Sequence, residues 1–470
     1  AELARLATAM GLDAEAVLPL LFSSAALQVE VVQGGSRVQL ASPLWVDGLR
    51  RASVNAGSAQ RVCAWAADAR LHASLDASGE GDWQKAREQL EQAWAIGLAL
   101  EREGLSADAL VRREILEGYV ALAERQGEAA SVRALADFAG QEAQRPGTAL
   151  SVATLRRWRG RAEAMVEPSA ELCAALELGV QGAREQGDVA ELGRCLHALG
   201  HVRRARGEWG VAEQLLGEAQ TRLAEALAQE HWGVPRRRLA LAWAEASRDL
   251  AEVYRELGRL DEAAASLERA LEPFVAQRDR QNEARTLLLL ARLARRRKRA
   301  RELAGYLDRA SRLFAGLDDR VGHAALVWEA AQQATDDGRL TDALRLVEHA
   351  RHLYAALGKR SSVVACLNAT GELRRKQGRW DEARQAYAEA WQVASELGHA
   401  GHRNAAAINL GWVSLAQHRP DEALAAFAAA ELDAAAPRAF VESRQLGWAE
   451  ALSALGRADE AAQVLARDAT

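Results

Sequence analysis

Two histidines and a cysteine form the strongest cluster of potential metal ligands in the sequence, and the pairs His349/His352 and His399/His402 are weaker candidates. His197 and His201 are four residues apart, which places both on one face of a helix, and Cys195 lies nearby. No Glu follows His197 to give the HExxH pattern of zinc hydrolases, and two ligands do not complete a metal site. The spacing therefore favours a solvated histidine pair, and we expect no bound metal.

Other catalytic patterns are equally incomplete. The string nearest to a phosphate-binding loop ends in Leu357-Gly358-Lys359-Arg360, with Leu353 where the first glycine belongs and Arg where the hydroxyl belongs. No GxSxG string marks a hydrolase nucleophile, and most carboxylates follow helix starts or stand at helical spacing from Arg. We therefore expect no enzyme activity and no cofactor in this chain.

Composition supports a soluble helical protein. Hydrophobic residues make up 49% and charged residues 27% of the 470 residues, and only 8 are proline. The formal net charge of -5 argues against binding to nucleic acid or anionic lipid over the whole surface.

Four cysteines lie far apart with no CxxC pair, and no signal peptide or membrane-spanning run is present, which predicts a cytoplasmic location. The chain begins at Ala1 without Met, so we expect it to be part of a longer protein.

A repeat of forty residues organises the second half of the chain. The string GRLDEA at Gly258 recurs as GRLTDA at 338, GRWDEA at 378, HRPDEA at 418 and GRADEA at 456, with a degenerate copy, KRAREL, at Lys298. Each string predicts a turn between two helices, because Gly suits the left-handed end of one helix and acidic residues suit the first turn of the next. We therefore expect a chain of helical hairpins.

Small and bulky residues recur at fixed offsets from the glycine of each string. The residue seven positions before the glycine is small: Ala251, Ala291, Ala331, Gly371, Gly411 and Ala449. The residue five positions after the glycine is alanine: Ala263, Ala343, Ala383, Ala423 and Ala461. The residue twelve positions after it is alanine as well: Ala270, Ala310, Ala350, Ala390 and Ala430. The residue nine after is bulky (Leu267, Leu307, Val347, Tyr387, Phe427, Leu465). Small side chains let helices approach closely, and the bulky one fills the remaining gap. Trp83, Trp209 and Trp380, two after the glycine, are expected in the core.

The pattern resembles the tetratricopeptide repeat (TPR) superfamily in a long form of about 40 residues rather than ~34. The resemblance is clear from about Gly193 to the end and fades upstream. It implies an all-α, right-handed superhelical solenoid of about ten hairpins. We predict divergent helical hairpins over 56–190 and the regular solenoid over 191–470.

The first 55 residues do not show the repeat pattern. Residues 3–22 read as short helices, and Leu27 to Val32 and Arg37 to Ala41 read as a β-hairpin around Gln33 to Ser36. This order resembles the end of a winged helix, and LQVEVVQGGSRVQLASPLWVDGLRRA resembles the junction with TPRs in bacterial STAND-class signalling ATPases and kinase-ATPase-TPR regulators. The resemblance implies a winged-helix-like remnant over 1–55 and an upstream ATPase or serine/threonine kinase.

The TPR resemblance places one face of each first helix in a concave groove, at three, six and ten residues before the glycine. The residues there are Arg204, Arg255, Arg295 and Arg375; His201, Glu252, Arg292, Gln332, Glu372 and Trp412; and His197, Arg248, Trp328 and Asn368. Arginine forks pair with carboxylates, so the groove is predicted to bind an acidic peptide or protein segment. The alternative for each Arg is that it complements a helix dipole.

Two further functional readings stay open. A stand-alone scaffold or adaptor would differ from a signalling module only in lacking upstream enzymatic sequence. A nucleic-acid-binding helical repeat is suggested by Arg295-Arg296-Arg297-Lys298-Arg299 and Arg236-Arg237-Arg238, although aromatic residues do not interleave with these runs and the overall charge is not basic.

Overall fold

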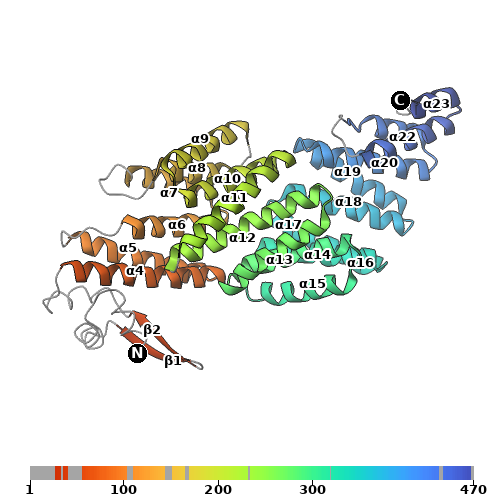
Figure 1. The fold of residues 1–470 in the computed structure, drawn as a ribbon. Helices are drawn as coiled ribbons and strands as arrows, with labels where there is room; N and C mark the ends of the chain where they lie inside the picture. Colours follow the sequence, from red (N-terminus) through yellow and green to blue (C-terminus); the bar gives the residue numbers. More distant parts are fainter. Residues whose placement is uncertain are drawn as a thin grey trace. The chain divides into compact units, whose positions relative to one another are not determined.

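The computed structural model describes residues 27–32, 35–40, 56–102, 109–142, 151–164, 169–230, 233–317, 319–432 and 438–466. Its contacts divide the chain into two compact units, which are treated separately below. Unit 1 comprises Ala1–Leu293 with Gly316–Asp318, and unit 2 comprises Ala294–Ala315 with Asp319–Thr470. Within the described ranges, the secondary structure is helical apart from one pair of strands (Figure 1).

Unit 1 holds the strand pair and the first helices. Its elements are β1 (Leu27–Val32), β2 (Gly35–Leu40), α4 (Ala56–Gly79), α5 (Trp83–Arg102), α6 (Ala109–Gln126), α7 (Ala129–Glu142), α8 (Val152–Ala164), α9 (Ala170–Gln186), α10 (Val189–Ala205), α11 (Trp209–Gln229), α12 (Gly233–Glu256), α13 (Leu260–Ala276) and most of α14 (Arg280–Arg296). The predicted divergent hairpins over 56–190 are thus helical wherever the structure describes them.

Unit 2 begins within α14 and continues through the regular repeats. Its helices are α15 (Ala300–Phe314), α16 (Arg320–Asp336), α17 (Leu340–Ala356), α18 (Arg360–Lys376), α19 (Trp380–Glu396), α20 (Ala400–Ala416), α21 (Pro420–Ala428), α22 (Arg438–Ala454) and α23 (Ala458–Ala466). None of the helices in the described ranges is both long enough and apolar enough to span a membrane. The predicted domain boundaries after residues 55 and 190 stay predictions, as does the handedness of the superhelix.

The strands pair antiparallel, with Leu27 opposite Leu40 and Val32 opposite Gly35. The second strand starts at Gly35 rather than at the predicted Arg37. The short helices predicted within 3–22 and the segment 42–49 lie outside the described residues. The winged-helix-like interpretation of residues 1–55 therefore stays a prediction.

The links between helices explain the forty-residue period. From α13 to α20, the helices other than α15 are seventeen residues long and start twenty residues apart, so two helices with their links make forty. Gly258 lies two residues after the last residue of α12 and has a left-handed φ of 78°. The next residue, Arg259, donates its backbone N–H to the carbonyl of Tyr254 at 2.8 Å and so closes the end of the helix. Lys298 and His418 hold the same left-handed conformation, with φ of 56° and 58°, in the two strings that lack glycine. The turn predicted from each string is confirmed.

Close helix packing occurs at the predicted small residues. A Cβ atom added to Gly371 would lie 2.6 Å from the ring of Tyr387, and one added to Gly411 would lie 2.5 Å from the ring of Phe427. The ten alanines predicted five and twelve residues after the glycine are all buried. Trp209 and Trp380 are partly buried against neighbouring clusters, as expected. Each bulky side chain thus fills the space that a missing or short side chain leaves.

Leu465 is the exception among the bulky residues. Its side chain is 51% exposed, although the pattern predicted a gap-filling residue there. Leu465 lies on α23, the last helix of the described residues, and no further described helix covers the outer side of α23.

Replacing Gly411 by Ala tests this packing. The added methyl group would collide with Phe427, so we expect a loss of about 1–3 kcal/mol in the free energy of unfolding. The matched control is Gly305→Ala on α15, where nothing lies within 4 Å of an added Cβ. Because Ala favours a helix over Gly, the control should gain up to about 1 kcal/mol. Urea unfolding measures both, and equal effects would contradict the packing role.

Candidate functional site

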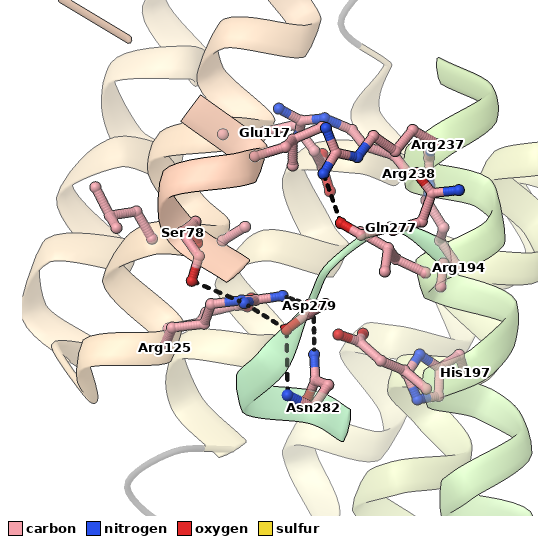
Figure 2. Close-up of a pocket in the computed structure, with 18 of the residues that line it drawn as sticks. Ser78, Glu117, Arg125, Arg194, His197, Arg237, Arg238, Gln277, Asp279 and Asn282 are labelled. Atoms are coloured by element: carbon pink, nitrogen blue, oxygen red, sulfur yellow. Dashed lines mark hydrogen bonds and ion pairs between the residues drawn. The ribbon is translucent and has the colours of Figure 1, made fainter. Parts of the chain in front are cut away.

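The inner side of unit 1 encloses a polar pocket. The end of α4 lies against the turn between α13 and α14, where a Cβ atom added to Gly79 would be 2.7 Å from the carbonyl oxygen of Arg278. Helix α4 also contacts α12. Unit 1 therefore curves until its first described helix meets its last hairpin, and the inner helices surround a pocket of about 350 Å³ (Figure 2).

We name this cavity the arginine pocket after the side chains that line it. Eight arginines contribute: Arg125, Arg157, Arg161, Arg194, Arg237, Arg238, Arg248 and Arg285. Five carboxylates contribute: Glu117, Glu124, Glu245, Asp249 and Asp279. His197 and His201 also face the pocket. Three of these arginines also pair with carboxylates just outside the lining, Arg157 with Glu191, Arg238 with Glu114 and Arg237 with Asp76, so the charges in and around the pocket are close to balanced.

Ion pairs between distant parts of the chain hold the pocket closed. Arg125 forms a two-pronged ion pair with Asp279, which also accepts hydrogen bonds from the backbone and side chain of Asn282 at 3.1 and 2.9 Å (Figure 2). Arg237 bonds to Asp76 at 2.7 Å, and Arg238 bonds to Glu114 at 2.9 Å. Burial alone would raise the pKa of Asp279, but the charge and hydrogen bonds of Arg125 outweigh it and hold that pKa below its usual value.

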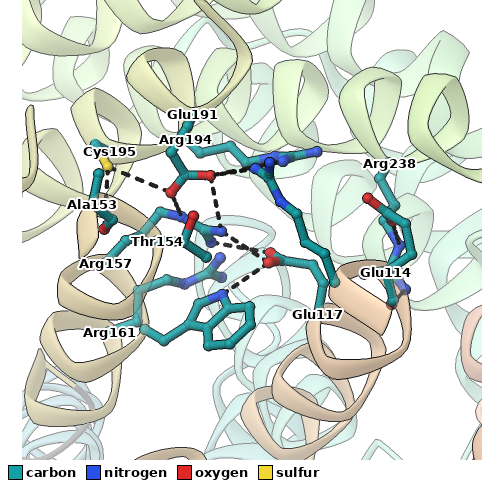
Figure 3. Close-up of polar contacts among 12 residues, drawn as sticks. Glu114, Glu117, Ala153, Thr154, Arg157, Arg161, Glu191, Arg194, Cys195 and Arg238 are labelled. Atoms are coloured by element: carbon teal, nitrogen blue, oxygen red, sulfur yellow. Dashed lines mark hydrogen bonds and ion pairs between the residues drawn. The ribbon is translucent and has the colours of Figure 1, made fainter. Parts of the chain in front are cut away.

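A buried cluster of charges forms one wall of the pocket (Figure 3). The Arg157 side chain is 1% exposed and donates to both carboxylate oxygens of Glu117 at 3.0 and 2.9 Å. Its Nε donates to Glu191 at 2.7 Å, and Glu191 also accepts from Arg113 at 2.9 Å. The indole N–H of Trp158 donates to Glu117 at 2.8 Å. Helices α6, α8 and α10 are thus joined by charge-assisted hydrogen bonds away from solvent.

These contacts keep the cluster ionised. Burial would raise the pKa of Glu117 and of Glu191, but the charge and hydrogen bonds of Arg157 together with the charges of neighbouring arginines outweigh burial, so both pKa values lie below the usual range. Burial raises the pKa of the Cys195 thiol well above its usual value, and the nearby carboxylate of Glu191 raises it further. Cys195 is therefore a neutral thiol in the core and is not a reactive or metal-binding group.

The predicted histidine pair meets a shared carboxylate. His197 Nε2 lies 3.1 Å and His201 Nδ1 lies 2.7 Å from the same oxygen of Asp249. Arg204 pairs with Glu252 at 2.8 Å and lies 3.7 Å from Asp249. The expectation of a solvated pair is wrong for His197, whose side chain is only 12% exposed because α12 supplies Asp249 beside it. Within the described ranges, no three potential ligands are grouped as a metal site would need.

The other residues predicted for the groove of unit 1 have partners of their own. Arg248 donates to the amide oxygen of Asn282 at 2.6 Å, and its guanidinium lies 5.7 Å from the centre of the Phe274 ring. Arg255 pairs with its neighbour Glu256. Arg292 is partly buried on α14. Of the predicted groove residues, His197, His201 and Arg248 are the ones that line the arginine pocket.

In unit 2 the predicted residues divide between the core and a second hollow. Trp328 packs against a core cluster, Gln332 and Asn368 are partly buried, and Arg295 lies 3.6 Å from Asp336. Glu372, Arg375 and Trp412 line an open hollow of about 430 Å³ together with Trp380, Asn409 and Glu450. Arg375 is held by Glu372 at 2.7 and 2.8 Å, and Trp412 donates to Ser443 at 3.0 Å.

Sequence reasoning missed the Glu117–Arg157–Glu191 cluster. These residues lie in hairpins that lack the repeat string, so no offset from a glycine pointed to them. A signal was present in the sequence: the stretch TLRRWRGR (154–161) carries Arg157 and Trp158 and is strongly positive, and such a run calls for carboxylates nearby in the fold.

Comparisons with known proteins support the fold and give no family. No protein-family model matches the chain, and no curated protein matches it. Among solved structures, the chain is similar to a Rap protein complexed with competence and sporulation factor (TM-score 0.55, 13% identity, 76% of this chain and 96% of the other). It is also similar to the apo form of the quorum sensor NprR from B. thuringiensis (TM-score 0.52, 14% identity, 74% and 94%). NprR in complex with its cognate peptide NprX has a TM-score of 0.49 at 14% identity, covering 75% and 97%.

The chain has a TPR-like fold. The predicted helical solenoid is confirmed at this level by the likeness to these helical repeat proteins.

Removing Arg157 should be strongly destabilising. The Arg157→Met variant leaves Glu117 and Glu191 buried without their shared partner, so we expect a loss of about 3–5 kcal/mol in the free energy of unfolding. The control is Arg159→Met on the same helix, because Arg159 pairs with Asp137 where both side chains are more than half exposed. That change should cost at most about 1 kcal/mol. Chemical unfolding followed by circular dichroism checks both values, and a mild effect of Arg157→Met would count against the cluster.

Acid should destabilise the protein through Asp249. Burial would raise the pKa of Asp249, but Arg204, His201 and the hydrogen bonds from both histidines hold it well below its usual value. The stability that this carboxylate adds is therefore complete above its unfolded pKa, near 4, and is lost as pH falls through the lower folded pKa. The Asp249→Asn variant should be less stable at neutral pH and should lose less stability below about pH 4. Melting temperatures measured across that range test this, and parallel curves for both proteins would refute it.

Proposed function

We propose that the chain is a peptide-binding module and that the arginine pocket of unit 1 holds an acidic part of the ligand. The observation that carries the proposal is that eight arginines converge on one cavity of about 350 Å³ and that two of them, Arg194 and Arg248, have no carboxylate of the described residues within hydrogen-bonding distance. The volume of the cavity lies within the range of known ligand pockets. Guanidinium groups pair with carboxylates in two-pronged geometry, which suits the acidic side chains or the terminus of a peptide.

The fold similarity supports the same proposal. NprR binds a cognate peptide, and the Rap structure contains competence and sporulation factor. TPR-like solenoids commonly use their inner surface to hold a partner segment. The likeness in fold makes peptide capture a reasonable use of the inner helices of unit 1, while the acidic character of the ligand is inferred from the pocket alone.

We place the anion contact in the pocket rather than along the predicted strip of arginines. Arg204, Arg255, Arg295 and Arg375 each have a carboxylate near them already. An acidic ligand would have to displace those carboxylates, whereas Arg248 in the pocket is held by the neutral amide of Asn282. Arg248 can therefore exchange a neutral partner for a charged one.

The wider setting is part of the proposal. A cytoplasmic signalling protein with a winged helix and an ATPase or kinase upstream would use this region as its sensor, as the sequence resemblance implies. A scaffold or adaptor without those domains would use the pocket in the same way.

Labelled decapeptides that alternate Ala with Glu, Gln or Lys test the charge preference. We expect the Glu peptide to bind at least roughly tenfold more tightly than the Gln peptide, because hydrogen bonds to charged groups are stronger. That advantage should shrink between about 50 mM and about 500 mM salt. Fluorescence anisotropy gives the dissociation constants.

Two variants separate the pocket from a general charge effect. Arg248→Gln removes a pocket arginine, and Arg312→Gln removes an arginine that is 74% exposed on α15. Both change the net charge equally. The first should reduce the preference for the Glu peptide and the second should leave it intact. Equal binding of all three peptides by the wild type would refute the proposal.

A further inference from the structure

Arg194 is the one arginine of the buried cluster that has no hydrogen bond among the described contacts. It lies on α10, its residue is 9% exposed, and it lines the arginine pocket beside Arg237 and Arg238 (Figure 2). The nearest carboxylate is Glu191, one turn earlier on the same helix, and the distance from Arg194 Nη1 to Glu191 Oε2 is 3.9 Å. The Arg194 nitrogens are not sealed in the core, so their hydrogens are available to a group in the pocket.

The neighbouring carboxylates are occupied by other donors. Glu191 accepts from Arg157 at 2.7 Å and from Arg113 at 2.9 Å. Glu117 accepts from both terminal nitrogens of Arg157 and from the indole of Trp158. These shorter bonds hold the two carboxylates on Arg157 (Figure 3), while Arg194 lines the pocket together with Glu117 and Arg157.

Arg238 is a second positive charge near Arg194, and the ionised carboxylates Glu117 and Glu191 also lie close to Arg194. Burial lowers the pKa of Arg238, and the charges of Arg194 and Arg157 lower it further, against the opposing effect of Glu114 and Glu117. Arg238 forms an ion pair with the carboxylate of Glu114 at 2.9 Å and donates a hydrogen bond to its backbone carbonyl at 2.7 Å, and so is committed to α6. An anion beside Arg194 would relieve this repulsion and satisfy its free hydrogen-bond donors.

We propose that Arg194 is the residue that recognises a carboxylate of the bound peptide. This inference rests on the proposed function. It adds the chemical group of the ligand that is recognised and the side chain that binds that group. Glu191 lies 3.9 Å from the guanidinium on the same helix, and Arg194 lines the pocket. A carboxylate in the pocket then receives a charge-assisted hydrogen bond, which is stronger than a bond between neutral groups.

A purely structural role for Arg194 makes a different prediction. Arg194 would then only help to neutralise Glu191, as Arg113 does from outside the pocket. Arg113 bonds to Glu191 at 2.9 Å, is 12% exposed and is not among the pocket residues. Arg113→Gln is therefore a matched control for Arg194→Gln, because each variant removes one positive charge next to the same carboxylate.

The test uses three acetylated pentapeptides built on alanine. One has Glu at its centre and an amidated end, one has Gln and an amidated end, and one has Gln and a free carboxyl end. Isothermal titration calorimetry on the full chain gives the dissociation constants, and differential scanning calorimetry confirms that each variant is folded.

We expect wild type to bind one or both of the carboxylate peptides roughly tenfold or more tightly than the neutral peptide. Whichever one shows the gain identifies the source of the carboxylate as a side chain or a chain end. In Arg194→Gln the ratio should fall to about 1, and in Arg113→Gln it should persist even if the melting temperature drops.

Different failures overturn different statements. A ratio that survives in Arg194→Gln removes the assignment of Arg194 and leaves peptide binding standing. A ratio that is lost equally in Arg113→Gln also overturns the assignment, because the effect would then come from general disturbance of the cluster. If wild type binds neither these pentapeptides nor the longer decapeptides, the proposed function fails as well.

Discussion

In the hairpins of this chain, a glycine or alanine on the first helix lies directly against a bulky side chain of the second. Gly371 with Tyr387 and Gly411 with Phe427 show the contact most clearly, since a single added carbon would overlap the ring. The backbones can approach this closely only because one partner lacks bulk. Helix spacing, the burial of the recurring alanines and the stacking of one hairpin on the next all follow from that approach.

The close packing also decides where polar groups can go. Inner helices of unit 1 lie so near one another that long side chains from α6, α8, α10 and α12 meet in a shared interior. Arginines and carboxylates placed there lose water and must satisfy each other, which they do through the Glu117–Arg157–Glu191 cluster and the pairs of Arg125 and Arg238. The result is a wall of paired charges on one side of the pocket.

Much of the fold could be predicted from the sequence because the same pattern of turn and packing residues occurs in several repeats. The glycine of each string, the alanines at five and twelve residues and the bulky residue at nine residues each have one local cause, and the structure confirms them with the exception of Leu465. The pocket could not be predicted in the same way. Asp279 and Arg125 are 154 positions apart, and their meeting depends on how far several irregular hairpins curve.

The candidate site was predicted only in part for the same reason. The phase of the repeat identified His197, His201 and Arg248, which do line the pocket. It also selected Arg255 and Arg375, whose partners are nearby carboxylates on their own helices, a local pairing that the sequence permits but does not prove. Arg157 and Arg194 lie outside the clear repeats or off the chosen face, so periodicity gave them no weight.

The curvature of unit 1 limits where a helical hairpin could be added to or removed from this protein. In unit 2, duplication of forty residues between α17 and α18 would reproduce every link and every packed pair, so copy number there is open to variation. In unit 1, an additional hairpin between α6 and α12 would separate Arg125 from Asp279 and Glu114 from Arg238. The number of hairpins is therefore fixed in unit 1 by the contacts between its first and last helices. In unit 2 the repeat itself sets no such limit.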